Sequence, residues 1–272
     1  MEVINKYFEH NRPDIFKVYA FGDIHAGSIH CAEHEIQRAV DKVKPDPYAY
    51  WVGMGDYADS ILANDPRFDI VGLKDWVKKD NILECQRDWL VDLFKPIAPK
   101  CLGLLTGNHE EQIHLRYQFD FTRNLCKALN VPYGGYACFL NLHFQRCKGE
   151  HGNRHTFTFH LWHGAGAAQT EGSRVMRLMR LVNEIQADIY LMGHLHCITS
   201  YTPDRLICQS GKVTSTKLVA AITGSWLTAY TQSKEGQELT PSYAERAGYK
   251  PTRIGCPVIY LDPDDNNFWI EC

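Results

Sequence analysis

The sequence predicts an α/β protein in which two sheets pack face to face and helices cover their outer surfaces. Over the first 130 residues, short apolar runs alternate with stretches of helical periodicity, which is the pattern of β-α units. From residue 136 onward, two alternating segments indicate strands of a second sheet. With 272 residues, the chain lies at the upper end of what one core serves. We therefore expect a single domain over residues 1–272, with a C-terminal part from about 197 rich in loops and strands.

Buried strands and helices alternate in the first half. The run Phe16–Phe21 (FKVYAF) is apolar and aromatic and ends at Gly-Asp, which is typical of a buried strand. Residues 31–44 show helical periodicity, and this helix should stop before Pro45. The same reasoning predicts strands over residues 48–54 and 101–105, and helices over residues 80–95 and 109–129.

Strands dominate the second half. Residues 136–146 and 155–162 alternate between apolar and polar side chains, as strands with one buried face do. A helix is expected at about residues 173–186, followed by a short apolar strand over Ile189–Met192. Two facing sheets with outer helices would bury all of these apolar faces.

The composition excludes several classes of protein. Apolar residues make up 44% and charged residues 22%, which excludes a disordered or collagen-like chain. No apolar run is long enough to span a membrane, and the charged N-terminus argues against a cleaved signal peptide. The net charge is -3, so no overall basic excess points to nucleic acid, although this does not exclude it. Ten cysteines without a CxxC motif indicate reduced thiols in a cytoplasmic protein. Because no apolar run could span a membrane, we expect no membrane partner.

Five predicted strands end in residues suited to metal binding. In open α/β sheets, sites form in the loops beyond the carboxyl ends of the strands. Singly, an aspartate after glycine is an ordinary turn residue and a lone histidine an ordinary half-buried side chain, but their repetition favours a site. The five strings are Gly22-Asp23-Ile24-His25, Gly55-Asp56-Tyr57, Gly107-Asn108-His109-Glu110, Trp162-His163-Gly164 and Gly193-His194-Leu195-His196.

Two pairs within these strings share a spacing of two residues. Asp23 and His25 would point to the same side of an extended segment, and His194 and His196 would do the same. Each pair is therefore suited to hold one ion. The adjacent glycines allow the backbone to turn sharply behind the ligands.

In their order, GDIH, GDYAD, GNHE, HG and GHLH resemble the five signature blocks of the calcineurin-like metallophosphoesterases. The resemblance spans residues 22–196. It implies a four-layer α/β/β/α sandwich of two mixed sheets, with a dinuclear metal site at the strand ends. It also implies that His109 contacts the substrate phosphate, so that His109, Asp56 and Asn108 form the catalytic set. By the same resemblance, one ion is held by Asp23, His25, Asp56 and His196, and the other by Asp56, Asn108, His163 and His194.

The donor atoms of this implied set are three carboxylate or amide oxygens and four imidazoles. Such donors suit transition metals better than magnesium or calcium, so we expect two divalent ions, manganese first, with iron, zinc, nickel or cobalt as alternatives. Two such ions clamp a phosphoryl group and generate hydroxide near neutral pH. Metal-dependent hydrolysis of phosphate esters is therefore the predicted activity.

Two positions separate this chain from the protein phosphatases that GDYAD and GNHE most resemble. Those enzymes carry an arginine after the first block and another before the second, where this sequence has Ser60 and Thr106. A guanidinium fork is hard to replace at a phosphate. We therefore expect a phosphodiesterase or nuclease. The alternative is a phosphomonoesterase acting on a nucleotide or small metabolite, and a non-catalytic scaffold is less favoured because every ligand position is filled.

Several neighbouring side chains have two interpretations. Glu110 either orients His109 or is a solvated acid at a helix N-terminus, and Asp59 either holds a ligand histidine or caps a turn. A basic stripe recurs every three residues on the helix after His163. It either binds a phosphate backbone, which would make nucleic acid a partner, or forms a solvated face in which Arg180 pairs with Glu184. The stripe consists of Arg174, Arg177 and Arg180.

Overall fold

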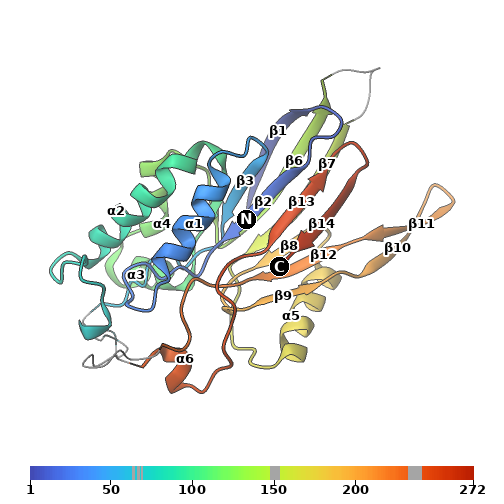
Figure 1. Cartoon of the computed structure of the whole chain (residues 1–272). Coiled ribbons are helices and arrows are strands. Elements are labelled where there is room, and N and C mark those ends of the chain that lie inside the picture. The colour runs from blue at the N-terminus through green and yellow to red at the C-terminus, as the bar shows by residue number, and fades with distance from the viewer. Residues whose placement is uncertain (63–64, 66–67, 69, 148–153, 232–240) are drawn as a thin grey trace.

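The structure is a computed structural model that describes residues 1–62, 65, 68, 70–147, 154–231 and 241–272. Two six-stranded mixed sheets face each other, and helices lie on both outer sides (Figure 1). The predicted four-layer α/β/β/α arrangement is confirmed.

The first sheet has the order β14-β13-β2-β3-β4-β5. Its four strands β2 to β5 run parallel, while β13 and β14 are added antiparallel at one side. The carboxyl ends of β2, β3 and β4 therefore meet at one edge. The bounds are β2 Phe16–Phe21, β3 Ala49–Gly53, β4 Cys101–Leu105, β5 Tyr133–Gly135, β13 Val258–Asp262 and β14 Asn267–Glu271.

The second sheet has the order β1-β6-β7-β8-β12-β9. Strands β7, β8 and β12 are parallel, so β7 and β8 also end side by side. A two-stranded hairpin of β10 and β11 projects away from this sheet (Figure 1). The bounds are β1 Glu2–His10, β6 Ala137–Arg146, β7 Arg154–Trp162, β8 Ile189–Met192, β9 Ile198–Tyr201, β10 Asp204–Gln209, β11 Lys212–Lys217 and β12 Val219–Thr223.

Strand β1 was not predicted. It pairs with β6 in parallel over all nine residues, and Ile4 and Phe8 pack against the core between the sheets. The inward positions alternate with exposed ones such as Val3 and Tyr7. This period of two was the available signal, but it is hidden because the charged Lys6 occupies an inward position and the apolar Val3 and Tyr7 face outward.

Helices cover the outer faces of both sheets. Helices α1, α2 and α4 pack on the first sheet, and α5 packs on the second. The described helices are α1 Glu33–Val43, α2 Ile82–Phe94, α3 Asn108–Tyr117, α4 Phe121–Leu129, α5 Glu171–Glu184 and the short α6 Tyr243–Arg246, with 3-10 turns at Ile70–Gly72 and Lys95–Lys100.

The predicted continuous helix over residues 109–129 is wrong, because the chain breaks there into α3 and α4. Gln118 adopts a left-handed conformation with φ of 57°, which ends α3. Asp120 then caps α4, since its carboxylate accepts the backbone N–H of Arg123 at 2.9 Å.

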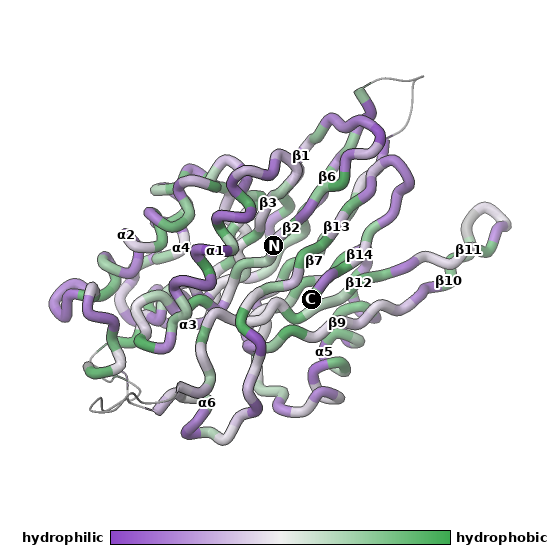
Figure 2. Tube along the Cα trace, viewed as in Figure 1, coloured by the Kyte–Doolittle hydropathy of each residue, from purple (hydrophilic) through white to green (hydrophobic). Residues whose placement is uncertain are grey.

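Apolar side chains fill the space between the layers. In Figure 2, green marks the hydrophobic residues along the strands. The inter-sheet core joins residues from both sheets, including Val18 and Val52 from the first and Leu140 and Phe159 from the second. All ten cysteines are unpaired. Within the described ranges, no helix has the length and apolar character needed to cross a bilayer.

Candidate metal centre

The predicted ligand residues converge at one end of the sandwich. They follow β2, β3 and β4 in the first sheet and β7 and β8 in the second. Because parallel strands of each sheet end at the same edge, loops far apart in sequence meet there. The convergent side chains are those of Asp23, His25, Asp56, Asn108, His163, His194 and His196.

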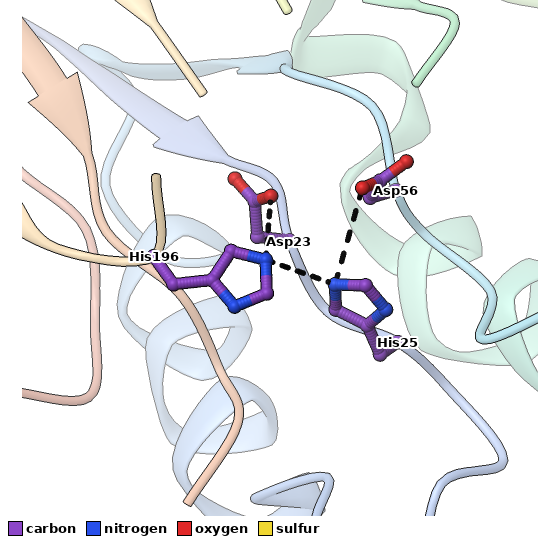
Figure 3. A group of neighbouring side chains, drawn as sticks. All are labelled: Asp23, His25, Asp56 and His196. Atoms are coloured by element: carbon purple, nitrogen blue, oxygen red, sulfur yellow. Dashed lines mark hydrogen bonds and ion pairs between the residues drawn. The ribbon is translucent and has the colours of Figure 1, made fainter. Parts of the chain in front are cut away.

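Four of these side chains form a first ligand group, shown in Figure 3. Nε2 of His196 lies 3.2 Å from Oδ1 of Asp23 and 3.2 Å from Nε2 of His25. Nε2 of His25 lies 4.0 Å from Oδ2 of Asp56. Asp23, His25 and Asp56 are buried, and His196 is half-buried.

A second ligand group shares Asp56 with the first. Oδ2 of Asp56 lies 3.4 Å from Nε2 of His163, and the ligand atoms of both residues cluster with His194. The amide oxygen of Asn108 lies 3.0 Å from Nε2 of His163 and 2.7 Å from Nδ1 of His194. The backbone carbonyl of Met54 contacts Nδ1 of His163 at 2.7 Å, which fixes the direction of that ring.

The two residue pairs at a spacing of two behave differently. Asp23 and His25 belong to the same group, whereas His196 faces the first group and His194 the second. Neither pair lies in an extended segment, because all four residues have φ between 49° and 69°. The expected extended geometry is therefore replaced by left-handed turns.

Backbone strain is concentrated at these ligands. Asp56 also has a positive φ, of 51°. Left-handed conformations of non-glycine residues cost energy and persist where surrounding structure enforces them. One such restraint comes from beyond β12, where Ser225 Oγ and the Trp226 N–H both donate to the carbonyl of Asp23 at 2.9 and 3.0 Å. Sequence reasoning missed this support, since no motif marks it.

Two glycines let the ligand loops approach each other closely. A Cβ on Gly107 would lie 2.1 Å from the backbone nitrogen of Asp56. A Cβ on Gly55 would lie 2.6 Å from Nδ1 of His163, and the φ of Gly55 is +91°. Any side chain at either position would push the two loops apart.

Glu110 holds the Asp56 loop against the start of α3. Its buried carboxylate accepts four backbone N–H groups, which fits neither sequence interpretation, because Glu110 is neither solvated nor bonded to His109. Burial and the nearby Asp56 raise the pKa of Glu110 to about 7 despite these bonds. The donors are Asp56 at 2.9 Å, Tyr57 at 2.7 Å, Ala58 at 3.2 Å and Gly107 at 2.9 Å.

Replacing Glu110 by glutamine should destabilise the fold and lower turnover together. Each carboxylate oxygen accepts hydrogen bonds from two N–H groups. In glutamine an amide nitrogen replaces one of these oxygens, and it cannot accept the two hydrogen bonds at that position. We expect a loss of about 2 kcal/mol or more in the free energy of unfolding, measured by denaturant titration. Glu111→Gln, on the next and exposed position, is the matched control. Equal behaviour of the two variants would contradict this role.

Asp59 lies against two histidines. Its carboxylate oxygen Oδ1 is 3.5 Å from Nδ1 of His25, so it holds a candidate ligand histidine, which is one of the two sequence interpretations. Its backbone carbonyl lies 2.5 Å from Nδ1 of His109. His25, Asp59 and His109 thus form a third cluster of ligating side chains beside the first group.

The charged side chains of the centre shift one another's pKa values. Burial opposes ionisation of Asp56, but His163 and His109 outweigh it and hold the Asp56 pKa well below its ordinary value. Burial lowers the pKa of His163, but Asp56 outweighs it and raises that pKa to about 10. Burial also lowers the pKa of His25 and of His194. The Asp56 carboxylate is therefore favoured in its ionised form and is stabilised by positive charge beside it.

These residues fit divalent transition-metal ions. Two imidazole nitrogens, of His25 and His196, face each other at 3.2 Å with carboxylate oxygens around them, an arrangement that a shared cation would stabilise. The set contains imidazoles, carboxylates and an amide, and among the described residues no cysteine belongs to it. Such donors match the transition metals rather than a structural zinc site with thiolates.

The arginines of the basic stripe have different surroundings. Arg174 Nε donates to the carbonyl of Ala168 at 3.1 Å. Arg177 donates to the carbonyls of Ala165 and Ala167 at 2.8 and 3.2 Å. Both therefore support the segment after His163. Arg180 is exposed, and no ion pair with Glu184 is seen among the residues that the structure describes.

Comparison with known proteins gives a family match. A family model described as calcineurin-like phosphoesterase matches residues 16–197. No curated protein sequence matches the chain. Among solved structures, a metallophosphoesterase from Sphaerobacter thermophilus is similar at 11% identity and a TM-score of 0.40, over 94% of this chain and 87% of that one. A conserved uncharacterized protein, predicted to be a phosphoesterase, from Streptococcus pneumoniae shows 14% identity and a TM-score of 0.31, over 95% and 98%.

Proposed function

Since the chain belongs to the calcineurin-like phosphoesterase family, a family of metal-dependent phosphoester hydrolases, we propose that it cleaves phosphodiesters, as a phosphodiesterase or nuclease. The observation that carries the proposal is the sharing of Asp56 between two ligand groups. One ion would bind the first group, and the other would bind the second group together with Asn108. The first group is Asp23, His25, Asp56 and His196, and the second is Asp56, His163 and His194.

When bound, two divalent ions polarise a phosphoryl oxygen and lower the pKa of water. The residues of this chain supply the remaining functions. Glu110 and Ser225 fix the positions of Asp56 and Asp23 through backbone hydrogen bonds. His109 lies at the edge of the centre, where its ring can hydrogen-bond a phosphate oxygen or deliver a proton to the departing group.

The diester preference rests on the residues beside the centre. Ser60 and Thr106 occupy the positions where the related protein phosphatases carry arginines. A phosphate monoester carries more charge than a diester, so it depends more on such guanidinium groups. Manganese is the proposed native metal, and the ten unpaired cysteines favour a reducing compartment such as the cytoplasm.

The test is a substrate panel with added Mn²⁺ and a parallel measurement of bound metal. The panel contains bis-p-nitrophenyl phosphate, p-nitrophenyl phosphate, cyclic nucleotides, single- and double-stranded DNA, and RNA. Turnover of diesters above the monoester supports the proposal. Turnover of the monoester alone would make the protein a phosphomonoesterase, and absence of both turnover and bound metal would make it a scaffold.

If the substrate is a polynucleotide, Arg180→Ala should weaken its binding. The slope of the logarithm of the binding constant against the logarithm of the salt concentration should become shallower by about one unit. Arg180 is exposed and on the same helix face as two arginines that already bond to carbonyls. Binding is measured at several salt concentrations, and Arg180→Lys, which keeps the charge, is the control. An equal loss on bis-p-nitrophenyl phosphate would contradict a role in phosphate-backbone binding.

A further inference from the structure

A recess lies directly beside the metal centre, between α3 and the segment that follows the Asp56 loop. One of its walls is a face of α3. His109, Gln112 and Arg116 recur there at intervals of three and four residues, which places them on one side of the helix. The proposed function uses His109 alone of these three.

The opposite wall contains a buried hydroxyl group that lacks a partner. Ser60 is 7% exposed, and its Oγ makes no hydrogen bond within the described residues. Its backbone is held in place, because its N–H donates to the Gln86 amide oxygen at 3.2 Å and its φ is 52°. A buried hydroxyl without a hydrogen-bond partner is destabilising, so this site is suited to a polar group from a ligand.

The size and charge of the recess restrict that ligand. The space available to the centre of a water-sized group is about 10 Å³, which is enough for one water molecule or hydroxyl. Arg116 lies 3.7 Å from the Asp65 carboxylate, so the wall carries a negative as well as a positive charge. A second phosphate group would meet that carboxylate, whereas an uncharged hydroxyl finds both donors and acceptors, including the Gln112 amide.

Two large apolar side chains also line the recess. Leu62 and Tyr117 line the recess, and Tyr117 is 42% exposed. An aromatic ring and a guanidinium group each provide a flat surface on which a nucleobase can stack. The recess therefore combines a hydroxyl-sized interior with a stacking surface at its mouth, which matches a sugar joined to a base.

On the basis of the proposed phosphodiesterase function, we propose that this recess binds the nucleoside part of the substrate. One sugar hydroxyl enters beside Ser60 Oγ, and the base lies across the mouth near Arg116 and Tyr117. His109 borders the recess and the metal centre alike, so a nucleoside here is joined to a phosphate at the centre. Arg116 is then a specificity-determining residue, which selects nucleotide esters over esters of simple alcohols.

The experiment compares two diesters with the same leaving group, thymidine 5′-(p-nitrophenyl) phosphate and methyl p-nitrophenyl phosphate, with Mn²⁺ present. The native protein should prefer the thymidine ester in kcat/KM. In Arg116→Leu the ratio of the two kcat/KM values should fall by about tenfold or more. Ser60→Ala should lower the same ratio. Arg38→Leu removes another arginine paired with an acid, Glu35, outside the recess, and should keep the native ratio.

Binding of thymidine 5′-monophosphate and of methyl phosphate to the metal-loaded protein, measured by calorimetry, separates the two proposals. Tighter binding of the nucleotide that is lost in Arg116→Leu supports the recess even if no ester is hydrolysed, in which case only the proposed function fails. Hydrolysis of both esters with a ratio that Arg116→Leu and Ser60→Ala leave unchanged overturns the recess and retains the function. Equal binding of the two ligands without hydrolysis overturns both.

Discussion

Replacing Asp56 by asparagine should reduce turnover to the background rate and lower the bound metal, while the fold survives. Asp56 is the side chain that the two ligand groups share. Its Oδ2 lies 4.0 Å from Nε2 of His25 and 3.4 Å from Nε2 of His163. An asparagine removes the negative charge that both ions would use, so neither group remains complete.

The fold should persist because the asparagine retains much of the structural role. Oδ1 of Asp56 accepts the backbone N–H of His109 at 2.9 Å, and an amide oxygen can accept the same bond. The measurements are turnover of bis-p-nitrophenyl phosphate, metal content by elemental analysis and thermal unfolding. Asp92→Asn, on the exposed side of α2, is the control. Near-normal turnover in Asp56→Asn would show that the ligand assignment is incorrect.

Local sequence signals were sufficient for three parallel strands of the first sheet, β2, β3 and β4, and for the candidate ligands that follow them. The runs Phe16–Phe21 and Cys101–Leu105 are observed as β2 and β4 with the predicted bounds. Both are short, apolar and followed by polar residues, so periodicity and turn chemistry agree. Because parallel strands end together, the polar residues after them converge, which is how a pattern along the chain predicts a site in space.

Other features depend on contacts that no local pattern encodes. The break at Gln118 splits one periodic segment into two helices, and glutamine has no particular preference for the left-handed conformation that it adopts. Glu110 was identified as important, but its four backbone partners come from a loop more than fifty residues away and from its own helix start. Ser225 lies outside the segment that resembles the family and contacts Asp23 only in the folded chain.

Replacing His109 by asparagine should harm substrates with poor leaving groups far more than p-nitrophenyl esters. The Nδ1 of His109 lies against the Asp59 carbonyl, which leaves Nε2 as the nitrogen available to a substrate. Burial lowers the pKa of His109, but the neighbouring Asp56 and Asp59 outweigh it and raise that pKa. General-acid catalysis contributes roughly 10²–10⁴-fold for a poor leaving group, whereas p-nitrophenolate departs without protonation.

The comparison therefore uses a dinucleotide and bis-p-nitrophenyl phosphate, with metal content measured for each protein. We expect His109→Asn to lower turnover of the dinucleotide by about 10²-fold or more relative to the chromogenic ester, at unchanged metal content. His114→Asn, an exposed histidine on the same helix, controls for the loss of an imidazole from α3. If both substrates lose the same factor, His109 binds phosphate and is not the acid. If metal is lost as well, His109 is a ligand, and the cluster of His25, Asp59 and His109 then belongs to the metal centre itself.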